Sequence, residues 1–286
     1  MRISITSSLL AIAATATVAG ALRAGVPTND PKKAKANVVT VTTVDYAFQA
    51  PDTIAAGRTT FHLVNKGPDM HHIWLIKLEQ GKTLKDLTEA AKTPGPLPKW
   101  AVDVGGPNTP MPGGETSATL DLEPGKYVMV CVIPAMKDGQ PHFMKGMVKE
   151  VAVVARRGVE QAGKAAAPAA DVTMTLDDYD FRLSSPITAA TKTIRFRNVA
   201  AQTHEAVIVK LNAGTTVEAF LQAMEKPQGP PPGALIGGIT GIAKGRTVDI
   251  PTSFAPGDYA LICFVPDAKD GKPHLAHGMV KQFSVK

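Results

Sequence analysis

The sequence has little cysteine, few aromatic residues and no long internal apolar run. Two cysteines in 286 residues exclude a disulfide-rich scaffold. Only 5% of the residues are aromatic, and no basic stretch is interleaved with aromatics, so nothing indicates a nucleic-acid site. Beyond the N-terminus, no apolar run reaches the ~18 residues that a membrane-spanning helix needs.

The composition that remains is that of a globular chain. Hydrophobic residues make up 44% and charged residues 20%, and the length suffices for two ordinary domains. The formal net charge is +6, from 31 basic and 25 acidic residues. Without Arg2 and Arg23 the chain has 29 basic and 25 acidic residues, a net charge of +4. Such a mild positive charge fits docking to an acidic partner or attraction to an anionic surface.

The first residues have the pattern of an export signal. Met1 and Arg2 form a positive start, residues 9–21 form a short apolar stretch, and residues 19–21 (Ala-Gly-Ala) offer a cleavage site, with Ala24 as a second possible end. We therefore expect residues 1–24 to be a cleaved signal peptide and the mature protein to be periplasmic or secreted, without an integral membrane segment. A retained membrane anchor is the alternative.

The chain contains an internal repeat with a period of about 132 residues. Residues 125–149 and 257–281 align without a gap and are identical at 13 of 25 positions. Other segments repeat as well and alternate between apolar and polar residues, which is typical of strands: 39–48 with 172–181, 61–67 with 194–200, and 70–78 with 203–211. A repeat of this length indicates duplicated domains rather than a solenoid.

Each copy also carries one helical pattern, at residues 83–92 and 216–226, ended by Pro94 and Pro227. Residues 94–114 and 227–238 are rich in Pro and Gly and are predicted to be irregular. The sequence thus predicts an all-β protein of two Greek-key β-sandwiches, each with one short inserted helix. We place the domains at residues 37–154 and 171–286, with a linker at 155–170.

The repeated segment conserves between its copies every residue type that binds soft metals. A thiolate, an imidazole and a thioether on one loop suit copper. A fourth ligand should come from an earlier strand, where the repeat aligns His71 with His204; His72 aligns with Glu205 and should face the other side. The shared residues of the loop are Cys131 with Cys263, His142 with His274, and Met147 with Met279.

The order Asn-x-Gly-x3-His, then a Gly-x-Tyr strand ending in Cys, then His-x4-Met, resembles the blue copper proteins, or cupredoxins. The resemblance covers residues 39–154 and 171–285. It implies one type-1-like copper site in each domain, with two His and one Cys in a plane and a long axial Met. The implied ligands are His71, Cys131, His142 and Met147 in the first domain and His204, Cys263, His274 and Met279 in the second.

The sequence departs from the family pattern in places. The interval of eleven residues from Cys131 to His142 is longer than in small cupredoxins and closer to that of two-domain copper nitrite reductases. Ala200 stands where the first copy has Gly67, and Met144 is a rival to Met147 as axial ligand.

Other readings of these residues stay open. Asn65 and Asn198 are expected to donate hydrogen bonds around the ligands. The cysteines could instead form a disulfide or be inert buried thiols, and Cys/His sets also bind zinc, which an axial Met disfavours. His62 and His277 are expected at the surface.

No catalytic copper cluster is expected. Enzymes of this family need further histidines beside the Cys and in His-x-His pairs, whereas here Val130 and Val132 flank Cys131, Ile262 and Phe264 flank Cys263, and no His-x-His occurs. The hypothesis is an exported electron-transfer protein, not an enzyme, that works with a redox protein partner. The alternatives are a copper carrier that serves a copper acceptor, and a metal-free interaction module of the cell envelope.

Overall fold

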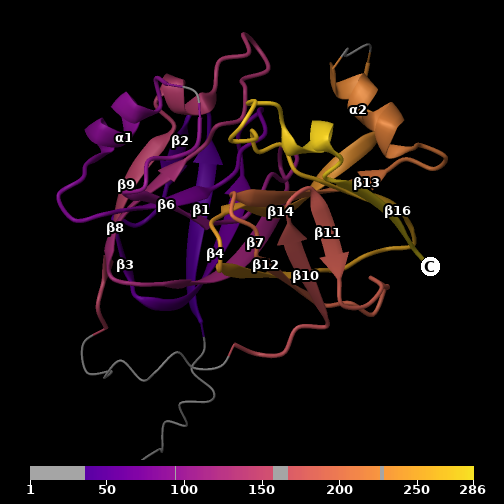
Figure 1. Cartoon of the computed structure of the whole chain (residues 1–286), viewed down its shortest axis with the longest axis horizontal. Coiled ribbons are helices and arrows are strands. Elements are labelled where there is room, and N and C mark those ends of the chain that lie inside the picture. The colour runs from indigo at the N-terminus through magenta and orange to yellow at the C-terminus, as the bar shows by residue number, and fades with distance from the viewer. Residues whose placement is uncertain (1–35, 94, 157–166, 226–228) are drawn as a thin grey trace, which may run out of the picture. The chain divides into compact units, whose positions relative to one another are not determined.

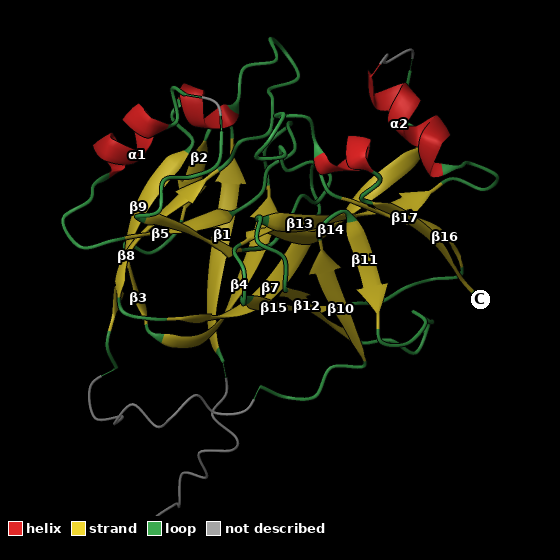
Figure 2. Ribbon diagram, viewed as in Figure 1, coloured by secondary structure: helices red, strands yellow, loops and turns green. Residues whose placement is uncertain are grey.

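A computed structural model describes residues 36–93, 95–156, 167–225 and 229–286. The predicted signal segment and residues 157–166 of the predicted linker lie outside the described residues, and the domain boundaries stay predictions. The described chain is built of strands with two short helices, which confirms the all-β fold class (Figures 1 and 2). In the part of the chain that the structure describes, none of the helices is long and apolar enough to cross a membrane.

The N-terminal half forms a β-sandwich of two sheets. One sheet carries the order β2-β1-β4-β7 and the other the order β6-β5-β8-β9-β3. β1 is parallel to β4, and β5 is antiparallel to β8, so strands distant in sequence become neighbours, as in a Greek key. The bounds are β1 (Asn37–Val44), β2 (Ala47–Gln49), β3 (Thr53–Ala55), β4 (Gly57–Asn65), β5 (Trp74–Leu78), β6 (Ala101–Gly105), β7 (Glu115–Leu122), β8 (Gly125–Val130) and β9 (Val148–Val154).

The C-terminal half repeats this sandwich. Its sheets have the orders β11-β10-β12-β15 and β17-β16-β13-β14, again with a parallel first pair, β10 with β12. The alternation seen in the sequence places one face of each strand in the core. The bounds are β10 (Val172–Asp177), β11 (Asp180–Leu183), β12 (Thr193–Asn198), β13 (His204–Leu211), β14 (Gly233–Ile242), β15 (Thr247–Pro251), β16 (Gly257–Ile262) and β17 (Val280–Val285).

The two sandwiches are joined through both of their sheets. Strand β7 pairs antiparallel with β15, and β6 pairs antiparallel with β14, so each sheet runs from one half into the other. The paired strands occupy equivalent places in the two copies. The junction therefore relates the halves approximately as a two-fold axis would, and it places equivalent segments of the copies against each other.

The main-chain hydrogen bonds beside β6 and β14 show the same symmetry. Residues 105–108 (Gly-Gly-Pro-Asn) align with residues 237–240 (Gly-Gly-Ile-Thr). The backbone nitrogen of Asn108 donates to the oxygen of Gly238 at 3.1 Å, and that of Thr240 donates to the oxygen of Gly106 at 3.0 Å. Asn108 and Thr240 are thus counterparts that face each other's half.

A buried carboxylate links the two halves within the other sheet, the one that contains β7 and β15. Asp249 of β15 accepts two hydrogen bonds of 2.8 Å from the guanidinium of Arg195 on the neighbouring strand and is also paired with Arg58 of β4. Asp249 is buried, and its charge is shared between an arginine of each half. Replacing Asp249 would take the shared carboxylate from both arginines, and the loss of one partner of a buried ion pair is costly.

The repeated Gly-x-Tyr motif has a structural role in both copies. Gly125 and Gly257 have φ of 151° and 142°, a conformation that favours glycine. Two residues later, the hydroxyl of Tyr127 donates to the oxygen of Glu123 at 2.8 Å, and that of Tyr259 to the oxygen of Ala255 at 2.7 Å. These bonds hold the start of β8 and β16 in the core, as in the tyrosine corners of other sandwiches.

Both predicted helices are present. α1 (Leu84–Ala90) begins at Thr83, whose side chain and that of Asp86 form a reciprocal capping box, and α2 (Val217–Glu225) buries Val217 and Phe220. In Figure 2 they lie at the same end of the sheets as the loops that carry the second histidine of each site.

One prediction about the Pro- and Gly-rich segments is wrong. Residues 94–114 contain β6, and residues 227–238 contain the start of β14, rather than irregular chain throughout. Gly and Pro have low strand propensity, so the pattern gave no sign of a strand. Pairing with β5 and β13, and with each other across the junction, fixes these segments as strands.

Asp103 of β6 gives a test of the junction. Its carboxylate accepts a hydrogen bond from Thr203 of the other half, and burial raises its pKa to about 6. Because the native state holds this proton more tightly than the unfolded state does, the contribution of Asp103 to stability should fall as pH rises from about 4 to about 6 and then level off.

We expect Asp103→Asn to raise the free energy of unfolding of the metal-free protein at pH 8 by about 2–3 kcal/mol and to have little effect near pH 4. Chemical denaturation at the two pH values measures this. A stabilisation that is equal at both would show that burial of the charge is not the cause.

Candidate metal centres

The first centre brings together three of the four predicted residues through their ligand atoms. His71, Cys131 and His142 are fully buried, and their ligand atoms lie within 4.8 Å of one another. The Nδ1 atoms of the two imidazoles are 3.1 Å apart, and the Cys131 sulfur is 3.4 Å from Nδ1 of His142. The rings are tilted by 51°, so both nitrogens face the same small space beside the sulfur.

Main-chain hydrogen bonds fix the loop that carries these residues. Cys131 directly follows β8; its backbone nitrogen donates to Met147 at 3.3 Å, and its oxygen accepts from Phe143 at 2.8 Å. His142 opens a 3₁₀ turn (His142–Lys145) that ends at Gly146 with φ of 98°. The loop therefore folds back on the strand end and brings His142 beside Cys131.

The fourth residue of the predicted set, Met147, lies on the same loop. It is fully buried, and its backbone nitrogen donates to the oxygen of His142 at 3.0 Å. Its counterpart Met279 is also fully buried and makes the same 3.0 Å bond to His274. Met144, by contrast, is 66% exposed, which favours Met147 over this rival.

A carboxylate outside the ligand set orients the first imidazole. Nε2 of His71 is 2.8 Å from Asp45, and Nε2 of His142 faces Asp69 at 3.4 Å. A neutral imidazole that donates its Nε2 proton to a carboxylate presents an unprotonated Nδ1, the form that binds a metal. Burial also lowers the pKa of both histidines, which keeps them neutral.

The sulfur of Cys131 is held by the backbone. The amide groups of His72 and Ile133 hydrogen bond to it, while burial raises the pKa of its thiol to about 12. In the absence of metal the thiol is therefore protonated at neutral pH. Two amide donors aimed at the sulfur would stabilise the thiolate once a cation replaces that proton.

The second centre has the same construction. His204, Cys263 and His274 are fully buried, and their ligand atoms also lie within 4.8 Å of one another. The Cys263 sulfur is 3.4 Å from Nδ1 of His274, as in the first centre. Amide groups of Glu205 and Val265 hydrogen bond to the sulfur, and burial raises the pKa of the thiol above its usual range.

Both centres fit a metal ion on the chemistry of their donors. Nδ1 of His204 is buried without a hydrogen-bond partner in the described structure, and in the first centre two Nδ1 atoms face each other. Such atoms are costly to bury unless something satisfies them. Two imidazoles, one thiol and a buried thioether on the same loop form the donor set that suits copper.

Several further predictions can be compared with the structure. Both cysteines are free and buried, each in its own centre. His72 is buried but outside the ligand cluster, with Nε2 accepting from the backbone nitrogen of Val132 at 3.2 Å. His62 and His277 are partly exposed and paired with acidic side chains, Glu115 and Asp270.

The asparagines do not contact the sulfur as donors. Asn65 donates to the oxygen of Asp69 at 2.8 Å and accepts from Gly67 at 3.0 Å, and Asn198 donates to Gln202 at 2.7 Å and accepts from Ala200 at 2.9 Å. They hold the loop before the first histidine. The expected role of donor around the ligands falls instead to backbone amides, which carry no signal in a sequence.

The residue after the first histidine was missed as a functional position. In the second copy it is Glu205, whose Oε1 accepts from the backbone nitrogen of Phe264 at 3.0 Å, as His72 accepts from that of Val132. Burial lowers the pKa of His72 to about 3 and raises that of Glu205 to about 7. The repeat aligned these residues, but different residue types concealed their equivalent roles.

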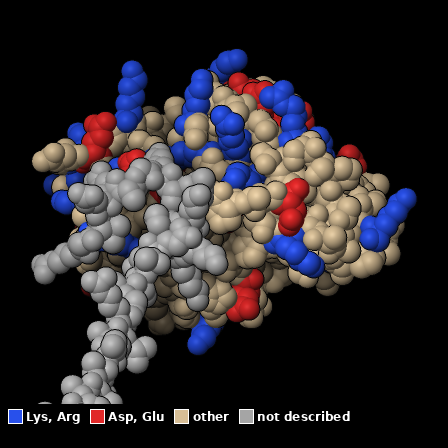
Figure 3. Space-filling model, turned by 90° about the horizontal axis from the view of Figure 1, so that it is seen from below, with Lys and Arg blue, Asp and Glu red and all other residues tan. Residues whose placement is uncertain are grey.

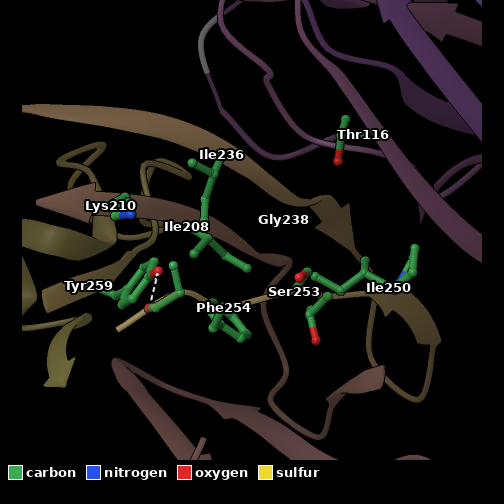
Figure 4. Close-up of a pocket in the computed structure, with 12 residues that line it drawn as sticks. Thr116, Ile208, Lys210, Ile236, Gly238, Ile250, Ser253, Phe254 and Tyr259 are labelled. Carbon is green, nitrogen blue, oxygen red and sulfur yellow. Dashed lines mark hydrogen bonds between the residues drawn. The ribbon is translucent and has the colours of Figure 1, made fainter. Parts of the chain in front are cut away.

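Other candidate sites are less well formed. Asp267, Asp270 and His277 could approach one cation, but two of the three are exposed, and Asp267 already accepts from Tyr179 and Gln202. A cavity of about 330 Å³ lies at the junction between residues such as Trp74, Asp103 and Thr203. The smaller cavity of Figure 4, about 220 Å³ and bordered by Tyr259 and Phe254, shares no residue with either centre.

Comparison with known proteins gives likenesses in structure alone. No family model and no curated protein matches the chain. Among solved structures, auracyanin from Roseiflexus castenholzii aligns at 20% identity over 42% of this chain and 99% of its own, with a TM-score of 0.29. A multicopper oxidase aligns at 13% over 87% of this chain and 88% of its own, with a TM-score of 0.24. Blue copper oxidase from Nitrosomonas europaea aligns at 12% over 88% and 86%, with a TM-score of 0.23. At these values none of them carries an argument about what this chain does.

The protonation of the ligand side chains predicts that metal binding releases protons. At pH 7 the imidazoles are neutral and the thiols protonated, so metal binding should displace about one proton per centre, from the thiol. Because the thiol would otherwise keep its proton up to a pH of about 12, affinity should rise roughly tenfold per pH unit around neutrality.

Calorimetry in buffers of different ionisation enthalpy counts these protons. Cys131→Ser should remove the release from one centre and leave the other. Binding at both centres without proton release would mean that the thiols are not ligands.

Gly67 offers a test of the carboxylate contact in the first centre. A Cβ at this position would lie 2.6 Å from Oδ1 of Asp45 and 2.6 Å from Nε2 of His71. The second copy has Ala200 there, and its equivalent contact, from Asp178 to His204, is longer at 3.2 Å. The ends of the two side chains can shift, so Gly67→Ala should fold but separate the carboxylate from the imidazole.

We expect Gly67→Ala to weaken copper binding in the first centre by at most about tenfold, the loss that is usual when the partner of a ligating histidine is removed, because the second centre keeps a longer contact beside Ala200. Competition with a copper chelator measures it. Ala200→Gly is the matched control and should not weaken the second centre. Equal affinity of Gly67→Ala and the natural chain would show that this contact is dispensable.

Proposed function

We propose that this chain, a tandem protein of two cupredoxin-like sandwiches, binds one copper ion in each half and transfers electrons. The observation that supports this best is the duplicated, fully buried His-Cys-His set, held together by hydrogen bonds that need no metal. Copper in a donor set of this type supplies a one-electron couple.

The protein residues would keep the ligand geometry constant. Each sulfur takes two backbone amide hydrogen bonds, and each first histidine is oriented by a carboxylate, Asp45 or Asp178. A frame that does not move between oxidation states leaves little rearrangement to accompany an electron. The fully buried ligands also exclude water, which limits side reactions.

A carrier of electrons fits the residues better than an oxidase or reductase. All seven histidines lie in the described part of the chain, and no further cluster of histidines accompanies the two sets there. The residues that flank the cysteines, such as Val132 and Phe264, cannot ligate a second ion. A path from thiolate to a catalytic cluster therefore has no residues to form it.

A copper carrier is the second candidate, and one observation favours it. The ligand loop of the first half carries two strongly exposed methionines, Met136 and Met144, at 75% and 66% exposure, where the second half has Ala268 and Ala276. Thioethers bind Cu(I), so these residues could accept an ion from solution and pass it inward.

Export and the partner follow as further proposals. The sequence of residues 1–24 predicts a periplasmic or secreted protein. In that location the two His-Cys-His sets would take up copper ions from outside the cytoplasm. The partner would be a redox protein. On the face shown in Figure 3, Lys and Arg are scattered with Asp and Glu among them, which suits a moderately acidic surface rather than a polyanion.

Titration with Cu(II), followed by visible absorption, tests the proposal. We expect an intense thiolate-to-copper band that rises to two equivalents per chain and disappears reversibly on reduction. Cys131→Ser and Cys263→Ser should each remove one equivalent of bound copper and about half of the band. The double variant should remove the band.

The outcomes separate the candidates. Copper that loads without the band, or that passes readily to an acceptor apoprotein while its redox cycling is slow, would favour the carrier. A chain that binds no copper, and whose function survives replacement of both cysteines by Ser, would favour a metal-free interaction module.

A further inference from the structure

The junction contains a buried polar side chain that contacts both halves next to their metal centres. Asn108 follows β6 and is 1% exposed. Its Nδ2 donates to Oε2 of Glu205 at 3.2 Å and to the oxygen of Ile239 at 3.0 Å, both in the C-terminal half. In its own half its side chain acts on the imidazole of His72, whose pKa a hydrogen bond with Asn108 raises against the larger lowering by burial.

Each of the outer residues contacts a cysteine segment. Nε2 of His72 accepts from the amide of Val132, and the amide of His72 itself bonds to the Cys131 sulfur. In the other half, Oε1 of Glu205 accepts from the amide of Phe264, and the amide of Glu205 bonds to the Cys263 sulfur. His72 and Glu205 are also bonded in the chain to the first histidine ligands of the two centres.

The result is a continuous series of hydrogen bonds and covalent bonds from one sulfur to the other. It runs through three buried side chains, His72, Asn108 and Glu205, which are 4%, 1% and 9% exposed. Buried polar groups are costly when apolar residues of similar size could pack in their place. The counterpart of Asn108, Thr240, shows that the symmetry of the junction does not require an amide here, since its hydroxyl contacts only the oxygens of Ile73 and Gly106.

We propose that the His72–Asn108–Glu205 bridge couples the two copper centres, so that electrons pass between them within one chain. The proposal rests on the proposed function and deepens it: the protein is a two-site relay rather than two independent carriers. With copper held in both sets, one electron would pass from the reduced centre to the oxidised one. No bond forms or breaks and no proton moves.

The bridge differs from the strand pairing in the groups on which it ends. At the junction β6 and β14 share a single residue pair in register, Val104 with Ile242, and β7 and β15 likewise share one, Thr119 with Asp249. The bridge alone, among the hydrogen bonds that the structure describes at the junction, ends on the amides that flank both cysteines. Asn108 is therefore the position at which the coupling can be cut without touching a ligand.

Asn108→Leu is the test variant, because leucine fills a similar volume and has no hydrogen-bonding group. Thr240→Val is the matched control: it removes the hydrogen bonds that the buried counterpart of Asn108 makes across the junction, to the oxygens of Ile73 and Gly106. For every variant, copper stoichiometry and the visible band of each centre are measured first. Asn108→Ser, which is polar but too short to reach both partners, serves if Asn108→Leu does not fold.

The rate of electron transfer between the two centres is measured on copper-loaded protein that receives one electron per chain by pulse radiolysis. The single-centre variants Cys131→Ser and Cys263→Ser supply the reference spectra; if these coincide, exchange in the half-reduced protein is followed by NMR. We expect this rate to be independent of protein concentration and unchanged by Thr240→Val. Asn108→Leu should slow it about tenfold or more, which is within the range of effects that mutations along a coupled network have.

An unchanged rate in the Asn108 variants, with both centres loaded, would overturn the bridge. So would a rate proportional to protein concentration, which would mean exchange between molecules. Failure of the proposed function looks different, because then the natural chain itself would lack the thiolate-to-copper band or would not take up electrons.

Discussion

The antiparallel pairing of equivalent edge strands is the constraint on which the arrangement of the whole molecule depends. A sandwich edge exposes unpaired backbone groups, and here each half covers two edges of the other, β7 with β15 and β6 with β14. Both sheets thereby become continuous across the junction. The same symmetry places the segment after each first histidine, with His72 and Glu205, against the middle of the molecule, where Asn108 contacts both.

Within each half, the metal centre depends on a loop that is fixed before any ion is present. The strand that ends in Cys131 or Cys263 and the following 3₁₀ turn are linked by main-chain bonds, and the aligned bonds of the two copies agree to within 0.1 Å. Carboxylates then select the tautomer of the first histidine. A donor set prepared in this way costs little reorganisation on binding, which is what electron transfer requires of a protein.

The copies differ in the residues around the ligands rather than in the ligands. The first centre has Gly67 and the exposed methionines Met136 and Met144, whereas the second has Ala200 and a buried Asp267 that accepts from Tyr179. His72 is neutral and Glu205 is able to ionise near neutrality. Hydrogen bonds and charges near the sulfur tune a copper site, so the proposed copper ions would sit in two different surroundings.

Most strands, both helices, the duplication and the six His and Cys residues of the two clusters could be predicted from the sequence, because period-2 patterns and a repeated Cys and His on one loop are local signals. The packing of the sheets fixes which edges meet, that segments 101–105 and 233–242 become strands, and that backbone amides rather than Asn65 and Asn198 contact the sulfurs. It alone also brought Asn108 to Glu205 across 97 residues. A hydrogen bond between distant segments depends on the packing of whole sheets, which no local pattern of residues records.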